Sequence, residues 1–210
     1  MSPSPEKTYT AFAGSRRIGG GTLVEAALPA KAALEADKWV QILIFDDVTG
    51  QVVDVDWRGN GEEVAARIVA DQRVAEDRAG EPAEDPVRRP GRPKLGVVAR
   101  EVTLLPRHWA WLASQPGGAS VALRKLVEQA SRTNQGRDRR RQARDSTYRF
   151  LSAIAGNLEG FEEAARALFA DQRALFVELV SAWPGDIGAH AKRLAAPAFE
   201  EPEDAAPSEH

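Results

Sequence analysis

The segment from Leu95 to Arg132 constrains the fold of this 210-residue chain most strongly, because it holds three consecutive elements with clear boundaries. Residues 97–105 are rich in Val, Leu and Thr, which indicates a strand. Pro106 ends that strand and suits the first turn of a short helix. The sequence Pro-Gly-Gly at 116–118 ends this helix, and Ser120 is expected to cap a second, longer helix.

Apolar residues recur at helical spacing in both predicted helices. Trp109 and Leu112 share one face of the first helix, and one face of the second carries Leu123, Leu126, Val127 and Ala130. A unit of about forty residues buries too little apolar surface to fold by itself. We therefore expect two copies of the chain to pair through this segment as a homodimer.

A strand, a short helix, a glycine turn and a longer helix in this order resemble the ribbon-helix-helix family of bacterial DNA-binding proteins. In that family two chains pair their strands into a ribbon that enters the major groove. The resemblance implies that the strand contacts bases, that amides near the start of the second helix bind a phosphate, and that basic side chains bind the DNA backbone. The DNA-binding residues that it implies are Arg100, Val102, Thr103, Leu104, Ser120, Arg124, Lys125, Arg132, Arg137, Arg139, Arg140, Arg141 and Arg144.

The sequence does not decide which face of the strand would point toward DNA. The two possible registers expose either Arg100, Val102 and Leu104 or Glu101, Thr103 and Leu105. Each set holds only one or two polar side chains, whereas the outward residues of the family are polar. The segment therefore has two candidate roles. It binds DNA in a transcriptional regulator, or it only dimerises within a non-enzymatic module that binds another protein.

A second resemblance covers most of the chain. Its residues are YTAFAG at 9–14, ILIFDD at 42–47, GRPKLGVVAREVTLLPRHW at 91–109 and YRFLSAIAG at 148–156. Together they are similar to the bacterial family catalogued as domain of unknown function 2239. This resemblance implies no particular activity, so the functional expectations depend on the residues themselves.

The net charge of −3 hides a strong asymmetry along the chain. Residues 1–87 carry a net charge of −7, residues 88–149 carry +11, and residues 150–210 carry −7. A concentrated positive field attracts polyanions, which favours DNA as a partner. The alternative is that the acidic segments fold back on the basic one and neutralise it.

Several chemistries lack the residues that they need. The chain has no Cys, and its three His residues are too far apart in sequence to bind a metal together, so we expect no metal site and no cofactor. His108 and His190 have no recognisable catalytic partner, and His190 is interpreted as a contact to a helix dipole, so we expect no enzyme. No apolar run is long enough for a membrane span or a signal peptide, which predicts a cytoplasmic protein that does not enter membranes.

The N-terminal part is expected to be a small α/β unit. Residues 8–13 indicate a strand, and Gly14 with the glycines at 19–21 indicates turns around residues 16–18. Residues 23–36 indicate a helix capped by Thr22 and kinked or restarted at Pro29. The next expected element is an antiparallel hairpin, with strands at 40–45 and 51–57 around a turn at 47–50.

Four carboxylates gather on this predicted hairpin, namely Asp46, Asp47, Asp54 and Asp56. Such a group suits Mg²⁺ or Ca²⁺. Period-two alternation alone, however, places Asp54 and Asp56 on the solvated face of an antiparallel sheet. We expect a solvated face and no metal.

The rest of the chain is expected to be helical. Residues 62–77 form a helix capped by Asn60, with Val64, Ile68 and Val74 inward. Residues 133–144 either extend the second central helix or form a mobile basic hinge, and three or four short helices follow. The C-terminal residues expected to pack inward are Tyr148, Phe150, Leu151, Ile154, Phe161, Ala165, Leu168, Phe169, Leu175, Phe176, Leu179 and Trp183.

These expectations define an α+β chain. It consists of an N-terminal α/β domain at 1–78, a linker at 79–94, a ribbon-helix-helix-like segment at 95–144, a C-terminal bundle of short helices at 145–195, and a disordered acidic tail at 196–210.

Overall fold

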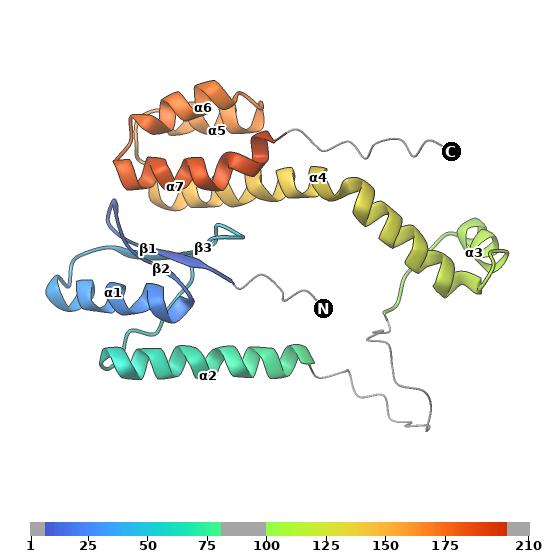
Figure 1. The fold of residues 1–210 in the computed structure, drawn as a ribbon, viewed down its shortest axis with the longest axis horizontal. Coiled ribbons are helices and arrows are strands. Elements are labelled where there is room, and N and C mark those ends of the chain that lie inside the picture. Colours follow the sequence, from blue (N-terminus) through green and yellow to red (C-terminus); the bar gives the residue numbers. More distant parts are fainter. Residues whose placement is uncertain (1–6, 81–99, 201–210) are drawn as a thin grey trace. The chain divides into compact units, whose positions relative to one another are not determined.

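The computed structural model describes residues 7–80 and 100–200 of the chain, apart from the side chains of residues 76–80 (Figure 1). The fold is α+β and mostly helical. Its elements are β1 (Tyr9–Ala13), β2 (Arg16–Gly21), α1 (Leu23–Ala36), β3 (Ile42–Asp46), α2 (Gly61–Gly80), α3 (Pro106–Ala113), α4 (Gly118–Ile154), α5 (Phe161–Phe169), α6 (Arg173–Ser181), α7 (Gly185–Ala195) and the 3₁₀ turn η1 (Ala196–Phe199).

The chain divides into two compact units. Unit 1 combines the chain up to Asp71 with the chain from Gly136 onward, and unit 2 covers Gln72–Gln135. Among the described residues no helix has the length and apolar character that a membrane span requires.

Three antiparallel strands in the order β2-β1-β3 form the sheet of unit 1. The strand expected at 8–13 is confirmed as β1. Of the turns expected around residues 16–18, the one at Gly14 is present, where Gly14 has a φ of 58°. The turn expected at the glycines 19–21 is wrong, because these residues continue β2. The glycines let α1 lie close to the strand, since a Cβ at Gly19 would meet the ring of Pro29 at 3.2 Å and the Ala26 carbonyl oxygen at 3.3 Å.

The predicted hairpin is only partly correct. Its turn is present, because the Gly50 amide donates to the Asp46 carbonyl at 2.8 Å and Gly50 has a φ of 67°. The return at 51–57 is not a strand, since only one isolated bridge joins Val52 to Phe45. Strand β3 pairs along its whole length with β1 on one edge, and the return contacts its other edge only near Phe45.

Helices α1 and α2 begin at capping boxes. The Thr22 hydroxyl accepts from the Glu25 amide, and the Glu25 carboxylate accepts from the Thr22 amide. Asn60 and Glu63 make the same reciprocal pair at the start of α2. Pro29 lies inside α1, which continues past it. Val64 and Ile68 are buried as expected, but Val74 is exposed, so the inward face of α2 is shorter than expected.

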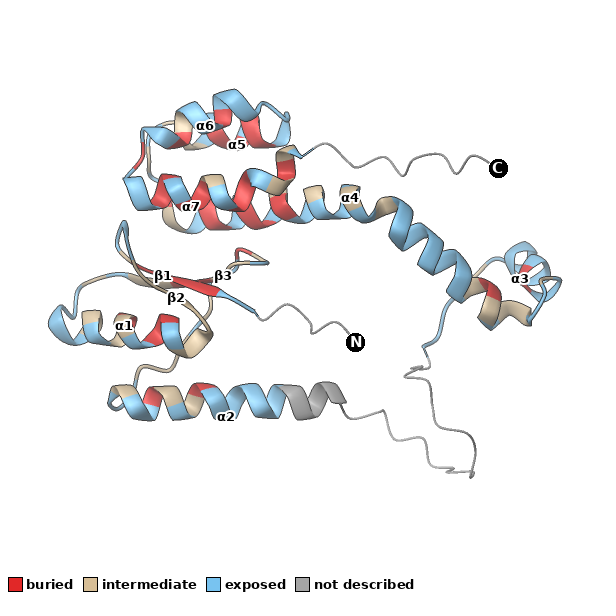
Figure 2. Ribbon diagram, in the orientation of Figure 1, coloured by how far each residue is buried: buried red, intermediate tan, exposed pale blue. Residues whose placement is uncertain are grey.

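The sheet of unit 1 shares a core with the C-terminal helices. Phe12 and Phe45 pack on Phe150 of α4, with ring centroids 5.7 and 4.8 Å away. Figure 2 shows buried residues on α7 and on the C-terminal part of α4. The expected run of short helices is confirmed as α5, α6 and α7. Asp171, between α5 and α6, has a left-handed φ of 61°.

Three residues expected to pack inward are exposed, namely Tyr148, Phe169 and Leu175. Tyr148 instead packs along the surface on Phe161 and Phe169, with ring centroids 6.5 and 5.6 Å away. Contacts between aromatic rings at the surface thus explain why aromatic residues at helical spacing are exposed here and not buried.

In unit 2 the first predicted helix is confirmed as α3, with Pro106 in its first turn. The second predicted helix is α4, which begins at Gly118, where the backbone has a left-handed φ of 77°. Ser120 therefore lies inside α4, and the prediction that it caps the helix is wrong. Helix α4 then continues to Ile154, so the basic run extends the helix, as one of the two alternatives expects. Residues 100–105 belong to no strand, and residues 97–99 lie outside the described residues.

Candidate functional site

Residues 100–105 and the N-terminal part of α4 carry the first group of predicted DNA-binding residues. Arg100, Val102 and Thr103 are exposed ahead of α3, and Leu104 is half-buried. Arg124, Lys125 and Arg132 are exposed on α4, where Arg132 pairs with Glu128. Ser120 lies within the first turns of α4, and its carbonyl oxygen accepts from the Arg124 Nε at 3.1 Å.

Four of the five arginines of the basic run, all but the exposed Arg137, form ion pairs inside unit 1. Arg140 and Arg144 both contact the Asp171 carboxylate, and donation from Arg140 lowers the pKa of that carboxyl. Two further pairs join Arg139 to Glu200 at 3.2 Å and Arg141 to Asp138 at 2.8 Å. Acidic side chains thus offset part of the positive charge of this run, as one of the two sequence interpretations expects.

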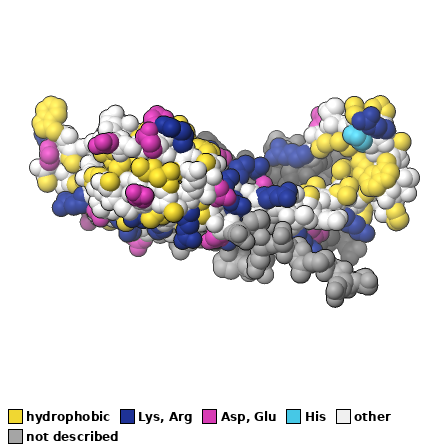
Figure 3. Space-filling view, turned by 90° about the horizontal axis from the view of Figure 1, so that it is seen from above, with side chains coloured by type: hydrophobic (Ala, Val, Ile, Leu, Met, Phe, Trp, Pro, Cys, Tyr) yellow, Lys and Arg dark blue, Asp and Glu magenta, His cyan; other side chains and the backbone are white. Residues whose placement is uncertain are grey.

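Unit 2 leaves most of its apolar side chains uncovered. Only Leu112 and Ala122 are buried among its described residues from 100 onward. The exposed apolar side chains are Val102, Leu105, Trp109, Trp111, Leu126 and Val127. Figure 3 shows apolar side chains beside Lys and Arg side chains at the right, on this unit. Clustered apolar side chains on a small unit indicate a contact surface for a partner.

A polar cluster lies between the sheet and α7 of unit 1. Arg193 Nη2 donates to Thr10 Oγ1 and to Asp47 Oδ1, at 3.1 Å in both cases. Thr10 Oγ1 in turn donates to Asp47 Oδ1 at 2.8 Å. Thr10 is fully buried, so this bonding satisfies a hydroxyl that would otherwise be costly inside the core.

His190 completes this cluster and is 4% exposed. Arg193 Nη2 lies 2.9 Å from His190 Nδ1. Because Arg can only donate, Nδ1 accepts and the neutral ring carries its proton on Nε2. Nε2 has no hydrogen-bond partner and lies 3.8 Å from Asp47 Oδ1. Burial, reinforced by the nearby Arg193 charge, lowers the pKa of His190 to about 4.

The interpretation of His190 as a surface contact to the helix dipole is therefore wrong. Its ring packs on Phe12 and Phe150, with ring centroids 5.4 and 4.5 Å away. Its neighbour Asp47 is 143 positions away in sequence, and no local pattern could have indicated that they lie close together. His108, in contrast, is exposed on α3.

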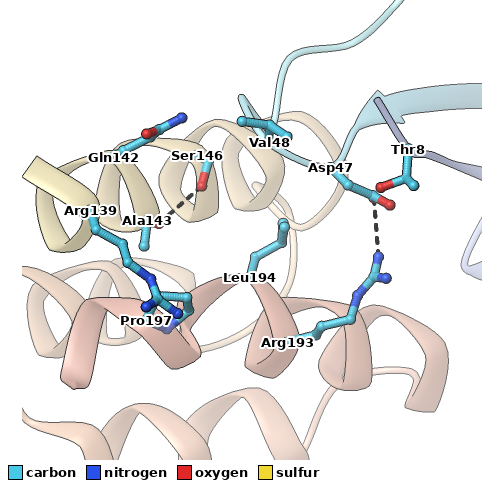
Figure 4. Close-up of a pocket in the computed structure, with 10 residues that line it drawn as sticks. All are labelled: Thr8, Asp47, Val48, Arg139, Gln142, Ala143, Ser146, Arg193, Leu194 and Pro197. Carbon is cyan, nitrogen blue, oxygen red and sulfur yellow. Dashed lines mark hydrogen bonds and ion pairs between the residues drawn. The ribbon is translucent and has the colours of Figure 1, made fainter. Parts of the chain in front are cut away.

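An open pocket of about 300 Å³ adjoins the polar cluster in unit 1 (Figure 4). Four separate segments of the chain line it: the residue just before β1, the turn after β3, helix α4, and the α7–η1 corner. The lining residues are Thr8, Asp47, Val48, Arg139, Gln142, Ala143, Ser146, Arg193, Leu194 and Pro197. Among these residues, only Arg139 is predicted from the sequence as a site residue.

The four carboxylates of the predicted hairpin lie in different surroundings, and Asp47 belongs to the polar cluster. Asp46 Oδ1 accepts from the Val48 and Thr49 amides, and Asp56 pairs with Arg58 and Arg67. Those guanidinium groups hold the pKa of Asp56 far below its usual range. Asp54 is exposed, and across residues 7–80 and 100–200 no three His, Cys, Asp or Glu side chains form a group that could hold a metal ion.

Comparison with known proteins places this chain in a bacterial family. The family model described as "Uncharacterized protein conserved in bacteria (DUF2239)" matches residues 8–195. The chain belongs to this family, and the match spans the sheet, the polar cluster, α3 and α4. No curated protein and no solved structure matches the chain.

Proposed function

We propose that the protein is a homodimer joined through residues 100–135, and that it acts as a non-enzymatic binding module. The observation that carries this proposal is the set of six exposed apolar side chains on unit 2, beside only two buried ones from residue 100 onward. A second copy would remove those side chains from water, and burying a Leu or Val side chain contributes about 1.5–3 kcal/mol. The enclosure of His190 by Phe12 and Phe150 also keeps its ring away from a substrate.

Val127 offers the sharpest test of this dimer, because 66% of its surface is exposed within one chain. Val127→Glu should therefore leave the fold of each chain intact and place a charge in the proposed interface. We expect light scattering to show a dimer for the wild type and a monomer for this variant. The matched control is Val177→Glu on α6 of unit 1, which should remain dimeric. A wild-type monomer at micromolar concentration would contradict the proposal.

Val102→Pro separates two forms of this dimer. If residues 97–105 of two copies pair as a ribbon, the proline removes a ladder donor and the dimer dissociates. If the copies join only through the faces of α3 and α4, the dimer persists. Val102 is exposed ahead of α3, so the change should not disturb one chain alone.

Duplex DNA is the second candidate partner, because Arg124 and Lys125 are exposed on α4 next to the apolar surface. We expect binding at about 50 mM salt that weakens as salt rises, with a slope of roughly −0.9 per phosphate neutralised. Changing both residues to Gln should make the slope shallower, whereas Arg166→Gln, in an ion pair on α5, should not. A folded dimer that binds no DNA would leave a protein partner as the function of the module.

A further inference from the structure

The pocket of unit 1 has the size and wall chemistry of a small-ligand site. Its volume of about 300 Å³ lies at the lower end of the range for ligand pockets. Its apolar wall consists of Val48, Ala143, Leu194 and Pro197. Thr8, Gln142 and Ser146 add polar groups. A short apolar body with one polar head group fits this combination.

Two guanidinium groups border the pocket from different helices. Arg193 comes from α7 and Arg139 from α4, and Figure 4 shows Leu194 between them. Arg193 uses Nη2 for its contacts with Thr10, Asp47 and His190, and Arg139 uses Nη2 for its contact with Glu200. A guanidinium has five N–H donors, so both side chains keep donors for a further anion.

The acidic partners of the two arginines differ in burial. The Asp47 side chain is only 11% exposed and is fixed by Thr10, so it remains part of the wall. The Glu200 side chain is 52% exposed, and the Arg139 side chain that it contacts is 64% exposed. Water screens such an exposed pair, so another carboxylate or a phosphate can replace Glu200 at little cost.

We propose that this pocket binds a small organic anion, whose carboxylate or phosphate head group contacts Arg139 and whose apolar body lies on Leu194 and Val48, toward Arg193 on the other side. Glu200 occupies the position of the head group at Arg139 when the ligand is absent. This site belongs to unit 1, so it does not depend on the dimer proposed through unit 2.

Three probes with one phenyl ring test the head group in the full-length protein by titration calorimetry at constant ionic strength. They are benzoate, phenyl phosphate and the neutral benzyl alcohol. We expect one anion per chain with a dissociation constant on the order of 1 mM or below, and much weaker binding of the alcohol. Tighter binding of benzoate assigns the site to carboxylates, and tighter binding of phenyl phosphate assigns it to phosphates. Equal binding of the alcohol would overturn the proposal.

Three variants locate the site. Arg139→Gln should weaken anion binding about tenfold, because a charge-assisted hydrogen bond is lost. Glu200→Gln should strengthen it up to about fivefold, because the competing carboxylate is gone. Arg141→Gln is the matched control, since Arg141 is exposed on the same helix but does not line the pocket. Equal effects of Arg139→Gln and Arg141→Gln, or no saturable anion binding by the folded wild type, would overturn the proposal.

Discussion

The two units of this chain differ in how they obtain a core. Unit 1 encloses four phenylalanines completely, namely Phe12, Phe45, Phe150 and Phe176. Unit 2 buries only Leu112 and Ala122 among its described residues from 100 onward and exposes two tryptophans, Trp109 and Trp111. Unit 1 therefore has an internal source of stability, whereas unit 2 leaves its apolar side chains exposed, and we propose that a second copy buries them.

Replacing Phe150 should produce the largest loss in unit 1. Phe150 is fully buried between Phe45 and His190, and truncating such a ring leaves a cavity. We expect Phe150→Ala to lower the free energy of unfolding by about 3–5 kcal/mol in urea titrations. Phe169→Ala, at an exposed aromatic, should cost less than about 1 kcal/mol. Similar losses for both variants would mean that unit 1 does not depend on this core.

Elements with local signals were predictable from the sequence. The helix at 23–36 was expected from the Thr22 cap, and the structure places α1 at Leu23–Ala36 with a capping box. Pro106 fixed the start of α3 in the same way. In the basic run, the high helix propensity of Arg, Gln and Ala keeps α4 continuous. The density of like charge in this run makes a mobile hinge the alternative expectation from the sequence.

Contacts between distant segments were not predictable. The turn at 47–50 indicated a hairpin, but β3 pairs with β1, because β1 offers a partner that no adjacent sequence reveals. The pocket and the polar cluster depend on the same long-range packing of β1 and β3 against α4 and α7. Period and capping rules describe one element at a time, so they gave no indication that Asp47, His190 and Arg193 lie together.

Acid should weaken unit 1 through His190, whose pKa falls from 6.5 to about 4 in the fold. Below pH 6.5 the unfolded chain takes up a proton at His190 that the folded ring does not, and this uptake favours unfolding. The part of the unfolding free energy that His190 contributes is therefore fully present above pH 6.5 and decreases as the pH falls to about 4. The loss amounts to about 2 kcal/mol between pH 7 and pH 5. Urea titrations at these two pH values measure it.

The His190→Gln variant should lack this contribution, so its stability should change by about 2 kcal/mol less than that of the wild type over the same interval. His108→Gln on the exposed surface of α3 is the control and should retain the wild-type dependence. An equal pH dependence in the wild type and in His190→Gln would show that the buried ring is not the group that titrates.

Gly50 tests how closely the turn after β3 approaches α4. A Cβ at this residue would lie 1.9 Å from the Ser146 carbonyl oxygen, and its φ of 67° disfavours other residues. We expect Gly50→Ala to cost about 2 kcal/mol or more, because strain and overpacking add. Gly14→Ala shares the left-handed φ but has open space around the added methyl, so it should cost about 1 kcal/mol. Equal costs in urea titrations would mean that the turn can move away from α4.

Asp171→Asn should have the smallest effect on stability and the most informative effect on charge. Asn tolerates the left-handed backbone of this residue, so the change removes only the charge facing Arg140 and Arg144. The unfolding free energy should fall by less than about 1 kcal/mol, because water screens a half-exposed pair.

If DNA is the partner, releasing these two arginines should raise the affinity at low salt and steepen the salt slope by up to about 1.8 per chain. Asp138→Asn is the matched control, because it releases only Arg141 on the same helix and should steepen the slope by at most about 0.9. Fluorescence anisotropy with a labelled duplex measures both slopes. A slope for Asp171→Asn equal to that of the wild type would show that Arg140 and Arg144 serve the fold of unit 1 alone, and would leave any DNA contacts to the other exposed cations.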